Sequence, residues 1–115
     1  MSPDSPLWRV FNAEQLIEEQ SETGVPYLEF LRVPALSCGM YSLPAGSKDL
    51  QSPHDEDEVY YVIRGRARLK VGGEEHVVGP DSVLYVPGSS EHSFVEIEED
   101  ITLLVFFASG GPSSN

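Results

Sequence analysis

Short apolar runs separated by glycine and proline fill most of the chain and predict an all-β protein with many tight turns. The run at residues 59–63 is β-branched and aromatic, which is typical of a strand buried on both faces. The run at residues 66–71 alternates basic and apolar residues, which indicates a strand with one buried face. Strands are predicted at residues 27–33, 36–43, 59–63, 66–71, 75–78, 83–86, 92–97 and 101–108.

One segment near the start departs from this pattern and predicts a short helix at residues 13–20. Asn12 is a suitable N-cap, Gln15 follows three residues later, and the segment from Ser21 to Gly24 ends the helix. So many short strands after one helix imply a β-sandwich or a small closed barrel, and closure of a barrel would hide the strand edges.

The length of 115 residues and the mass of 12.7 kDa fit one domain. We expect an N-terminal arm and helix at residues 1–24, a β-barrel at 25–108 and a disordered tail at 109–115, where Gly, Pro and Ser dominate. A single cysteine excludes an internal disulfide, and no apolar run approaches the roughly 18 residues of a membrane span. With no signal-peptide pattern, these features predict a cytoplasmic location.

The charge balance narrows the class of partner. The chain carries 19 acidic and 7 basic residues, for a formal net charge of -12. Because such a field repels phosphate, we expect neither nucleic acid nor an anionic membrane as a partner.

Three residues of types that bind metals stand out: His54, Glu58 and His92. His54 and Glu58 lie four residues apart, so an extended chain would point both side chains to the same face. Two imidazoles and one carboxylate form a known ligand set for iron, and the same set suits manganese, zinc or nickel. The spacing alone leaves other interpretations open. The histidines could be solvated loop residues, and Glu58 could form a buried hydrogen bond.

The segment from Gly46 to Gly65 resembles the first motif of the cupin superfamily. That motif reads Gly, five residues, His-x-His, three or four residues, Glu, six residues and Gly, and here His54 and Glu58 hold the second His and the Glu. A later stretch resembles the second motif, in which Pro-x-Gly is followed after two residues by His, here His92. The resemblance implies the cupin double-stranded β-helix, a jelly-roll barrel, with a short N-terminal helix.

Two departures from the motifs change what the resemblance implies for the site. The first His falls at Ser52, a poor metal ligand, and the Gly of Pro-x-Gly falls at Ser89. The implied site therefore has three ligands, His54, Glu58 and His92, with Ser52 or a water at the fourth position. Other residues expected at the fourth position or around the pocket are Gln51, Tyr60, Phe94 and Cys38.

Several other polar residues have simpler interpretations. Cys38 lies among apolar neighbours, so we expect a small core residue, with a pocket thiol as the alternative. His76 follows a Gly-Gly hairpin and is expected on the surface. The acidic residues 55–57 are expected to form a solvated rim.

For function, the resemblance implies a protein that binds a divalent metal (Fe, Mn, Zn or Ni) and a small oxygen-bearing ligand in the barrel. Such a protein could be a metal-dependent oxygenase, isomerase or lyase, and the catalytic residues stay open. The alternative is a non-catalytic binding or sensor module, with or without metal. A metal-free sugar epimerase or isomerase is less favoured, because no motif places a basic residue to bind a sugar phosphate. We also expect a homodimer, formed through residues 1–24 and the first strand.

Overall fold

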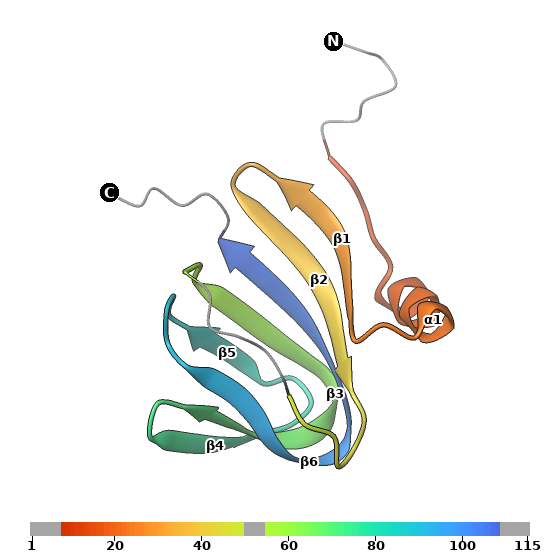
Figure 1. Cartoon of the computed structure of the whole chain (residues 1–115). Helices are drawn as coiled ribbons and strands as arrows, with labels where there is room; N and C mark the ends of the chain where they lie inside the picture. Colours follow the sequence, from red (N-terminus) through yellow and green to blue (C-terminus); the bar gives the residue numbers. More distant parts are fainter. Residues whose placement is uncertain (1–7, 50–54, 109–115) are drawn as a thin grey trace.

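The computed structural model describes residues 8–49 and 55–108 (Figure 1). One helix precedes an antiparallel sheet, so the all-β prediction is confirmed. None of the described residues belongs to a helix long and apolar enough to cross a membrane. The elements are α1 (Ala13–Thr23), β1 (Tyr27–Val33), β2 (Leu36–Leu43), β3 (Glu58–Val71), β4 (Glu74–Val78), β5 (Val83–Val86) and β6 (His92–Ala108).

Helix α1 begins at the predicted cap and ends about one turn later than predicted. The side chain of Asn12 accepts a 3.1 Å hydrogen bond from the backbone N–H of Gln15. Gly24 then takes a left-handed conformation and donates its N–H to the carbonyl of Gln20. The buried Gln20 amide also donates to the carbonyl of Pro26 at 2.7 Å and accepts from the Ser42 hydroxyl at 2.9 Å. These contacts fasten the helix to the sheet.

The strands form one sheet in the order β1-β2-β6-β3-β4, and β5 pairs with the first half of β3. Strands β3 and β6 lie at its centre and pair with each other along most of their length. The sequence predicted four strands where the structure has these two, because the intervening residues form bulges and do not end the ladder. Figure 1 shows both strands curving strongly, so that the sheet rolls over its inner face.

Gly65 allows the bend in β3. It lies within the bulged region and has a φ of 97°. A Cβ at this position would collide with the carbonyl oxygen of Asp100 and would lie 2.5 Å from the Cα of Ile101. Only glycine permits the two central strands to approach so closely here.

The inner face of the rolled sheet carries the hydrophobic core. Along the first half of β3, Tyr60 and Val62 are buried, whereas Val59, Tyr61 and Ile63 are only half-buried. The prediction that residues 59–63 are buried on both faces is therefore wrong, because only the inner face is covered by other strands. The buried core residues shared by the central strands include Leu69, Phe94, Ile97, Ile101, Leu103 and Val105.

Candidate functional site

Glu58 and His92 meet on the inner face of the sheet. Glu58 opens β3 and His92 opens β6, and their side chains are almost completely buried, each 2 % exposed. The Nε2 atom of His92 lies 3.2 Å from Oε2 of Glu58. Two of the three residues predicted as metal ligands are therefore neighbours, although their role as ligands stays a prediction.

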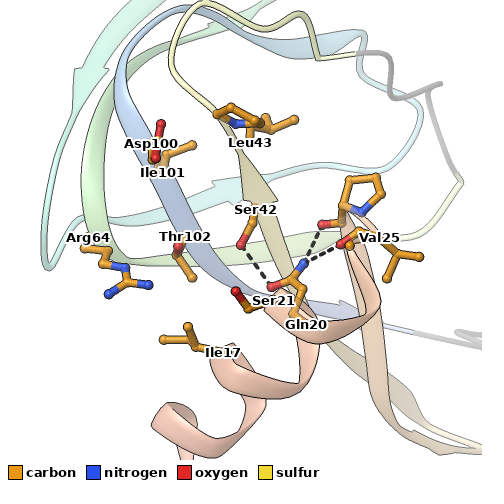
Figure 2. A pocket seen from close by; sticks show the side chains of 13 residues that line it. Ile17, Gln20, Ser21, Val25, Ser42, Leu43, Arg64, Asp100, Ile101 and Thr102 are labelled. Carbon is orange, nitrogen blue, oxygen red and sulfur yellow. Dashed lines mark hydrogen bonds between the residues drawn. The ribbon is translucent and has the colours of Figure 1, made fainter.

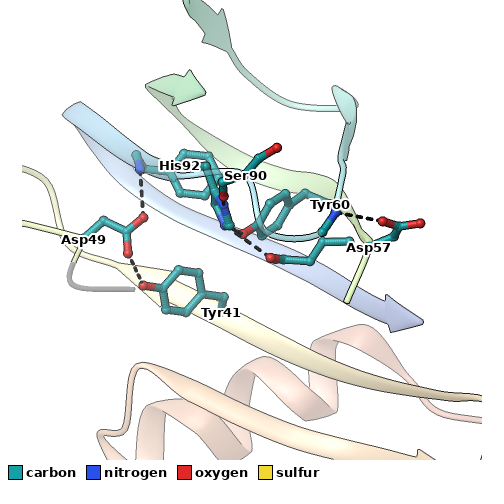
Figure 3. A network of polar contacts seen from close by, with 9 residues as sticks. Tyr41, Asp49, Asp57, Tyr60, Ser90 and His92 are labelled. Atoms are coloured by element: carbon teal, nitrogen blue, oxygen red, sulfur yellow. Dashed lines mark hydrogen bonds and ion pairs between the residues drawn. The ribbon is translucent and has the colours of Figure 1, made fainter. Parts of the chain in front are cut away.

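Both ring nitrogens of His92 face oxygen atoms. Nδ1 lies 2.9 Å from the carbonyl oxygen of Ser90, which can only accept, so Nδ1 carries a proton and donates it (Figure 3). Nε2 faces the Glu58 carboxylate and also lies 3.1 Å from the hydroxyl of Tyr60. The contact between Nε2 and an ionised carboxylate is favourable when a proton or a cation lies between them. The hydrogen bond to Glu58 is accordingly the main cause that raises the pKa of His92 above its usual value, against the opposing effect of burial.

Tyr60 and Phe94 lie next to each other on the inner face of the sheet, and Tyr60 contacts His92; their place in a binding pocket stays a prediction. Tyr60 is fully buried, and its ring meets the ring of Phe94 edge-on with centroids 5.3 Å apart. Tyr60 is on β3 two residues after Glu58, so the two side chains point to the same face. The aromatic contact fixes the ring, and hence the position of its hydroxyl near His92.

Asp49 links strands β2 and β6 beside the site through its carboxylate, a role that the sequence did not indicate. Its Oδ1 accepts a 2.6 Å hydrogen bond from the hydroxyl of Tyr41 on β2, and its Oδ2 accepts a 2.8 Å bond from the backbone N–H of Phe94 on β6 (Figure 3). The first residues of β6 pair with β3 but not with β2, so this carboxylate links β2 to β6 where no ladder does. Burial and the bond to Asp49 raise the pKa of Tyr41 far above its usual value.

The acidic segment at residues 55–57 holds the turn that leads to His92. Oδ1 of Asp57 accepts a 2.7 Å hydrogen bond from the N–H of Gly88, and Oδ1 of Asp55 accepts a 3.3 Å bond from the Ser89 hydroxyl. A Cβ on Gly88 would collide with the carbonyl oxygen of Asp55, so the turn and the segment before Glu58 are in close contact. The expectation of a merely solvated rim is therefore incomplete, because Asp55 and Asp57 also make specific contacts.

Tyr27 on β1 adds a further hydroxyl to the inner face. Its ring meets those of Tyr41 and Phe107 edge-on, each with centroids 6.3 Å apart. The buried hydroxyl has no hydrogen-bond partner in the described part of the chain. Burial, with a smaller effect from the charge of Glu29, raises the pKa of Tyr27 to about 12. The inner face thus presents three phenols, those of Tyr27, Tyr41 and Tyr60.

Three of the predicted site residues fall on a part of the chain that the structure does not describe. These residues are His54, Ser52 and Gln51. Among residues 8–49 and 55–108, no three His, Cys, Asp or Glu side chains gather as a metal-binding group. His76 is exposed, as expected.

Cys38 is buried, as expected, but it does not share the face of the sheet that carries Glu58 and His92; its role as a pocket thiol stays a prediction. It pairs with Phe106 across the ladder, on the opposite face of the sheet from Tyr41. There it lines an outer groove of about 400 Å³ together with Trp8, Phe11 and Phe30. Side chains alternate between the two faces along β2, and Gly39 and Tyr41 take the inner positions. Cys38, which lies between them, therefore points outward.

A second groove, of about 590 Å³, lies between α1 and the outside of the barrel (Figure 2). Ile17 and Gln20 line it from the helix, and Arg64 and Thr102 line it from β3 and β6. The Gln20 amide is fully engaged with Ser42 and with nearby carbonyls, so it holds the helix in place. Neither Glu58 nor His92 lines this groove.

Comparison with known proteins decides the family. The model of the cupin domain family matches residues 39–107, which include Glu58, His92 and the central strands except the last residue of β6. The chain belongs to the cupin superfamily. A protein of Streptomyces coelicolor, SCO3923, is 43% identical to this cupin over 100 residues, covering 87% of this chain and 95% of that protein.

Solved structures share the cupin fold. A cupin superfamily protein from Desulfitobacterium hafniense has a TM-score of 0.66 at 16% identity, covering 72% of this chain and 75% of the other. An RmlC-like cupin with a double-stranded β-helix from Methanocaldococcus jannaschii has a TM-score of 0.67 at 16% identity, covering 73% and 79%. The protein named DMSP lyase DddQ from Ruegeria pomeroyi has a TM-score of 0.63 at 20% identity, covering 72% and 42%. At these identities the likeness shows the fold alone.

Glu58 and His92 meet two of the geometric requirements for neighbouring ligands of one metal ion. Two ligands at about 2.0–2.2 Å from one ion lie about 2.8–3.6 Å apart for angles at the ion between about 90° and 110°. The 3.2 Å separation of Glu58 Oε2 and His92 Nε2 falls in this range. A metal-bound histidine usually donates its other N–H to a carbonyl or carboxylate, and the bond from His92 to Ser90 is of this kind.

Proposed function

We propose that this cupin binds a divalent metal ion through Glu58 and His92, with His54 as the third ligand, and a small oxygen-bearing ligand at an open position. The observation that carries the proposal is the orientation of His92. Its Nδ1 is bonded to the Ser90 carbonyl, and this bond directs Nε2 toward the buried Glu58 carboxylate. A metal bound there would supply Lewis-acid chemistry to an oxygen atom of the ligand.

The chain's own residues have distinct roles in this proposal. The Ser90 carbonyl selects the tautomer and the orientation of His92. The buried rings of Tyr60 and Phe94 exclude water from one side of the site. Asp49 holds β6 near β2, and so keeps the wall beside His92 in place.

The proposal is tested by metal content and by direct titration. Metal is measured by mass spectrometry in purified protein, and metal-free protein is titrated calorimetrically with Zn²⁺ and Mn²⁺. We expect about one ion per chain, and a loss of affinity of about tenfold or more in Glu58→Gln and His92→Gln. Glu98→Gln, which changes an exposed carboxylate of β6, is the matched control. Absence of binding by the unaltered chain, with every metal tried, would refute the proposal.

A second candidate is a non-catalytic binding or sensor module that uses the cavity without metal. The observation that favours it is the contact between Glu58 and His92. When His92 is protonated, the two side chains balance each other's charge, and no metal ion is needed between them. Activity screens separate the candidates, and oxygen uptake, isomerisation and lyase reactions are the classes to screen. Lyase chemistry is included because one protein of this fold is named a DMSP lyase. Ligand binding by metal-free protein without turnover would support the module.

We also propose that two copies pair through the outer face of the sheet. Apolar side chains on this face include the partly exposed Phe106 of β6 and the exposed Val83 and Tyr85 of β5, and the exposed Trp8 of the N-terminal segment lines the outer groove with Phe106. Because both copies carry a net charge of -12, an apolar patch is the most favourable place for them to meet. Sedimentation should give a dimer, and Phe106→Glu should give a monomer. A monomer for the unaltered chain at high concentration would refute pairing.

A further inference from the structure

Three polar residues form a row across the strands that lie beside helix α1. Thr102 on β6 pairs with Ser42 on β2 and, on its other side, with Arg64 on β3. All three line the groove of about 590 Å³ between α1 and the outside of the barrel. Figure 2 shows their side chains one after another along the strand side of this groove. Residues far apart in the sequence therefore present hydroxyl groups and a guanidinium to one groove, and its volume suits a small molecule.

The hydroxyl of Thr102 is open to a ligand in this groove. Thr102 is only 5 % exposed, yet its hydroxyl makes no hydrogen bond with any residue that the structure describes. The hydroxyl is also not among the unbonded polar atoms that are sealed inside the described part of the chain, so it reaches the groove that Thr102 lines. By contrast, the Ser42 hydroxyl is engaged, because it donates to the Gln20 side chain at 2.9 Å. A hydroxyl without a partner is unfavourable in so buried a place, and a ligand atom would supply the partner.

Arg64 brings a positive charge to the same end of the groove. Its side chain is exposed, and it forms no ion pair with an acidic side chain of residues 8–49 or 55–108. Two other arginines, Arg32 and Arg68, are each paired with a glutamate. In a chain with a net charge of -12, a guanidinium at a groove without such a partner favours an anion from outside the chain.

The rest of the lining selects the remainder of the bound molecule. Much of the groove wall is apolar and would cover an apolar body of the ligand. The apolar lining residues include Ile17, Val25, Leu43 and Ile101. Asp100 also lines the groove, and its Oδ1 accepts a 2.8 Å hydrogen bond from the N–H of Ala45. The negative charge of Asp100 disfavours a second carboxylate on the ligand.

We propose that this groove binds a small monocarboxylic acid with an apolar body, and that Arg64 and Thr102 hold its carboxylate. The guanidinium donates charge-assisted hydrogen bonds to the carboxylate oxygens, and the Thr102 hydroxyl donates a further bond to one of them. The apolar body then lies between α1 and the strands. Because neither Glu58 nor His92 lines the groove, the inference does not depend on the proposed metal binding.

Titration of the full-length chain followed by NMR tests the proposal. The probes are hexanoate and three molecules of the same carbon length, hexanol, hexylammonium and adipate. We expect hexanoate to shift the amide signals of groove residues, and the other three to bind about tenfold more weakly. In Arg64→Gln the affinity for hexanoate should fall about tenfold, and in Thr102→Val about threefold or more.

Control variants separate the groove from general effects on the chain. Arg66→Gln is the matched control, because Arg66 lies two residues further along β3, is exposed and does not line the groove. This variant should keep the affinity for hexanoate. Ser21→Trp adds a large ring to an exposed helix residue that lines the groove, and it should block hexanoate even if Thr102→Val does not fold. Circular dichroism verifies that each variant is folded.

Three results would overturn the inference. The first is that hexanoate in the millimolar range leaves the amide signals of the groove unchanged. The second is that hexanol, hexylammonium or adipate binds as tightly as hexanoate, which would contradict the assigned class of ligand. The third is that folded Arg64→Gln keeps the full affinity for hexanoate, which would place the carboxylate elsewhere.

Discussion

The backbone N–H of Gly88 donates a 2.7 Å hydrogen bond to Oδ1 of Asp57. Asp57 immediately precedes Glu58, and the turn that contains Gly88 leads into His92. This single contact therefore joins the two segments that carry the candidate metal ligands. It depends on close approach of backbone to backbone, because a Cβ on Gly88 would collide with the carbonyl oxygen of Asp55.

Gly88→Ala should destabilise the protein and disturb the site. The atom that the new methyl group meets is backbone, which cannot rotate away, so we expect a loss of about 1–3 kcal/mol in the free energy of unfolding. Urea denaturation measures this change. Gly73→Ala is the control, because nothing lies within 4 Å of a Cβ there. Equal stability of the two variants would contradict the close approach.

Ser89→Gly should stabilise the protein. Ser89 has a φ of 67°, in the left-handed region that glycine adopts without strain, and it stands where the cupin motif has glycine. We expect a gain of about 0.5–1 kcal/mol after the unfolded-state entropy of glycine is included. Thermal and urea denaturation both report the gain. The control is Ser90→Gly: Ser90 has no positive φ to relieve, so this change should lower stability. A lower free energy of unfolding for Ser89→Gly would contradict backbone strain at Ser89.

Removal of two inner-face hydroxyls should have opposite effects. Tyr41→Phe loses the 2.6 Å bond to Asp49 and should cost about 1–2 kcal/mol in the free energy of unfolding. Tyr27→Phe removes a buried hydroxyl that has no partner in the described part of the chain, so its effect should be neutral or stabilising by up to about 1 kcal/mol. Chemical denaturation of both variants gives the comparison. If Tyr27→Phe were the more costly change, the hydroxyl would have a partner.

The ionisation of Tyr27 should be delayed to high pH. Its pKa in the folded state is raised to about 12, above the value near 10 of an unfolded chain, so folding favours the neutral phenol. Its contribution to stability is complete below about pH 10 and is lost as the pH rises from about 10 to 12. Ultraviolet difference spectroscopy follows tyrosine ionisation, with circular dichroism to monitor folding. The folded protein should contain one tyrosine that ionises near pH 12 and that is missing in Tyr27→Phe. If the two proteins had the same titration curve, the raised pKa of Tyr27 would be contradicted.

Local patterns predicted most of the elements. The cap at Asn12 and the turn at Gly24 bound the helix, and strands β1, β2 and β5 have the predicted bounds because proline and glycine flank them. The bulges that join predicted strands into β3 and β6 were not predictable in this way, since they depend on pairing between distant residues.

The candidate site was predicted only in part, for a similar reason. The spacing of Glu58 and the motif around His92 indicated that both belong to one site, and the structure places them together. Asp49 and Asp57 were missed as contributors because each bonds to a backbone N–H far away in the sequence, at Phe94 and Gly88. An acidic residue before a strand carries no local sign of such a partner.

The inner face combines two central strands with the edge strand β1, and these differ in how many neighbours hold them. Glu58 and His92 both belong to the two central strands, whose pairing fixes their separation. Tyr27 belongs to the outermost strand β1, which is bonded to β2 alone among the described strands. Substitutions on β1 can thus change the inner face around Tyr27 while the contact between Glu58 and His92 keeps its geometry. Under the proposed function, selectivity for the ligand and affinity for the ion would then evolve independently.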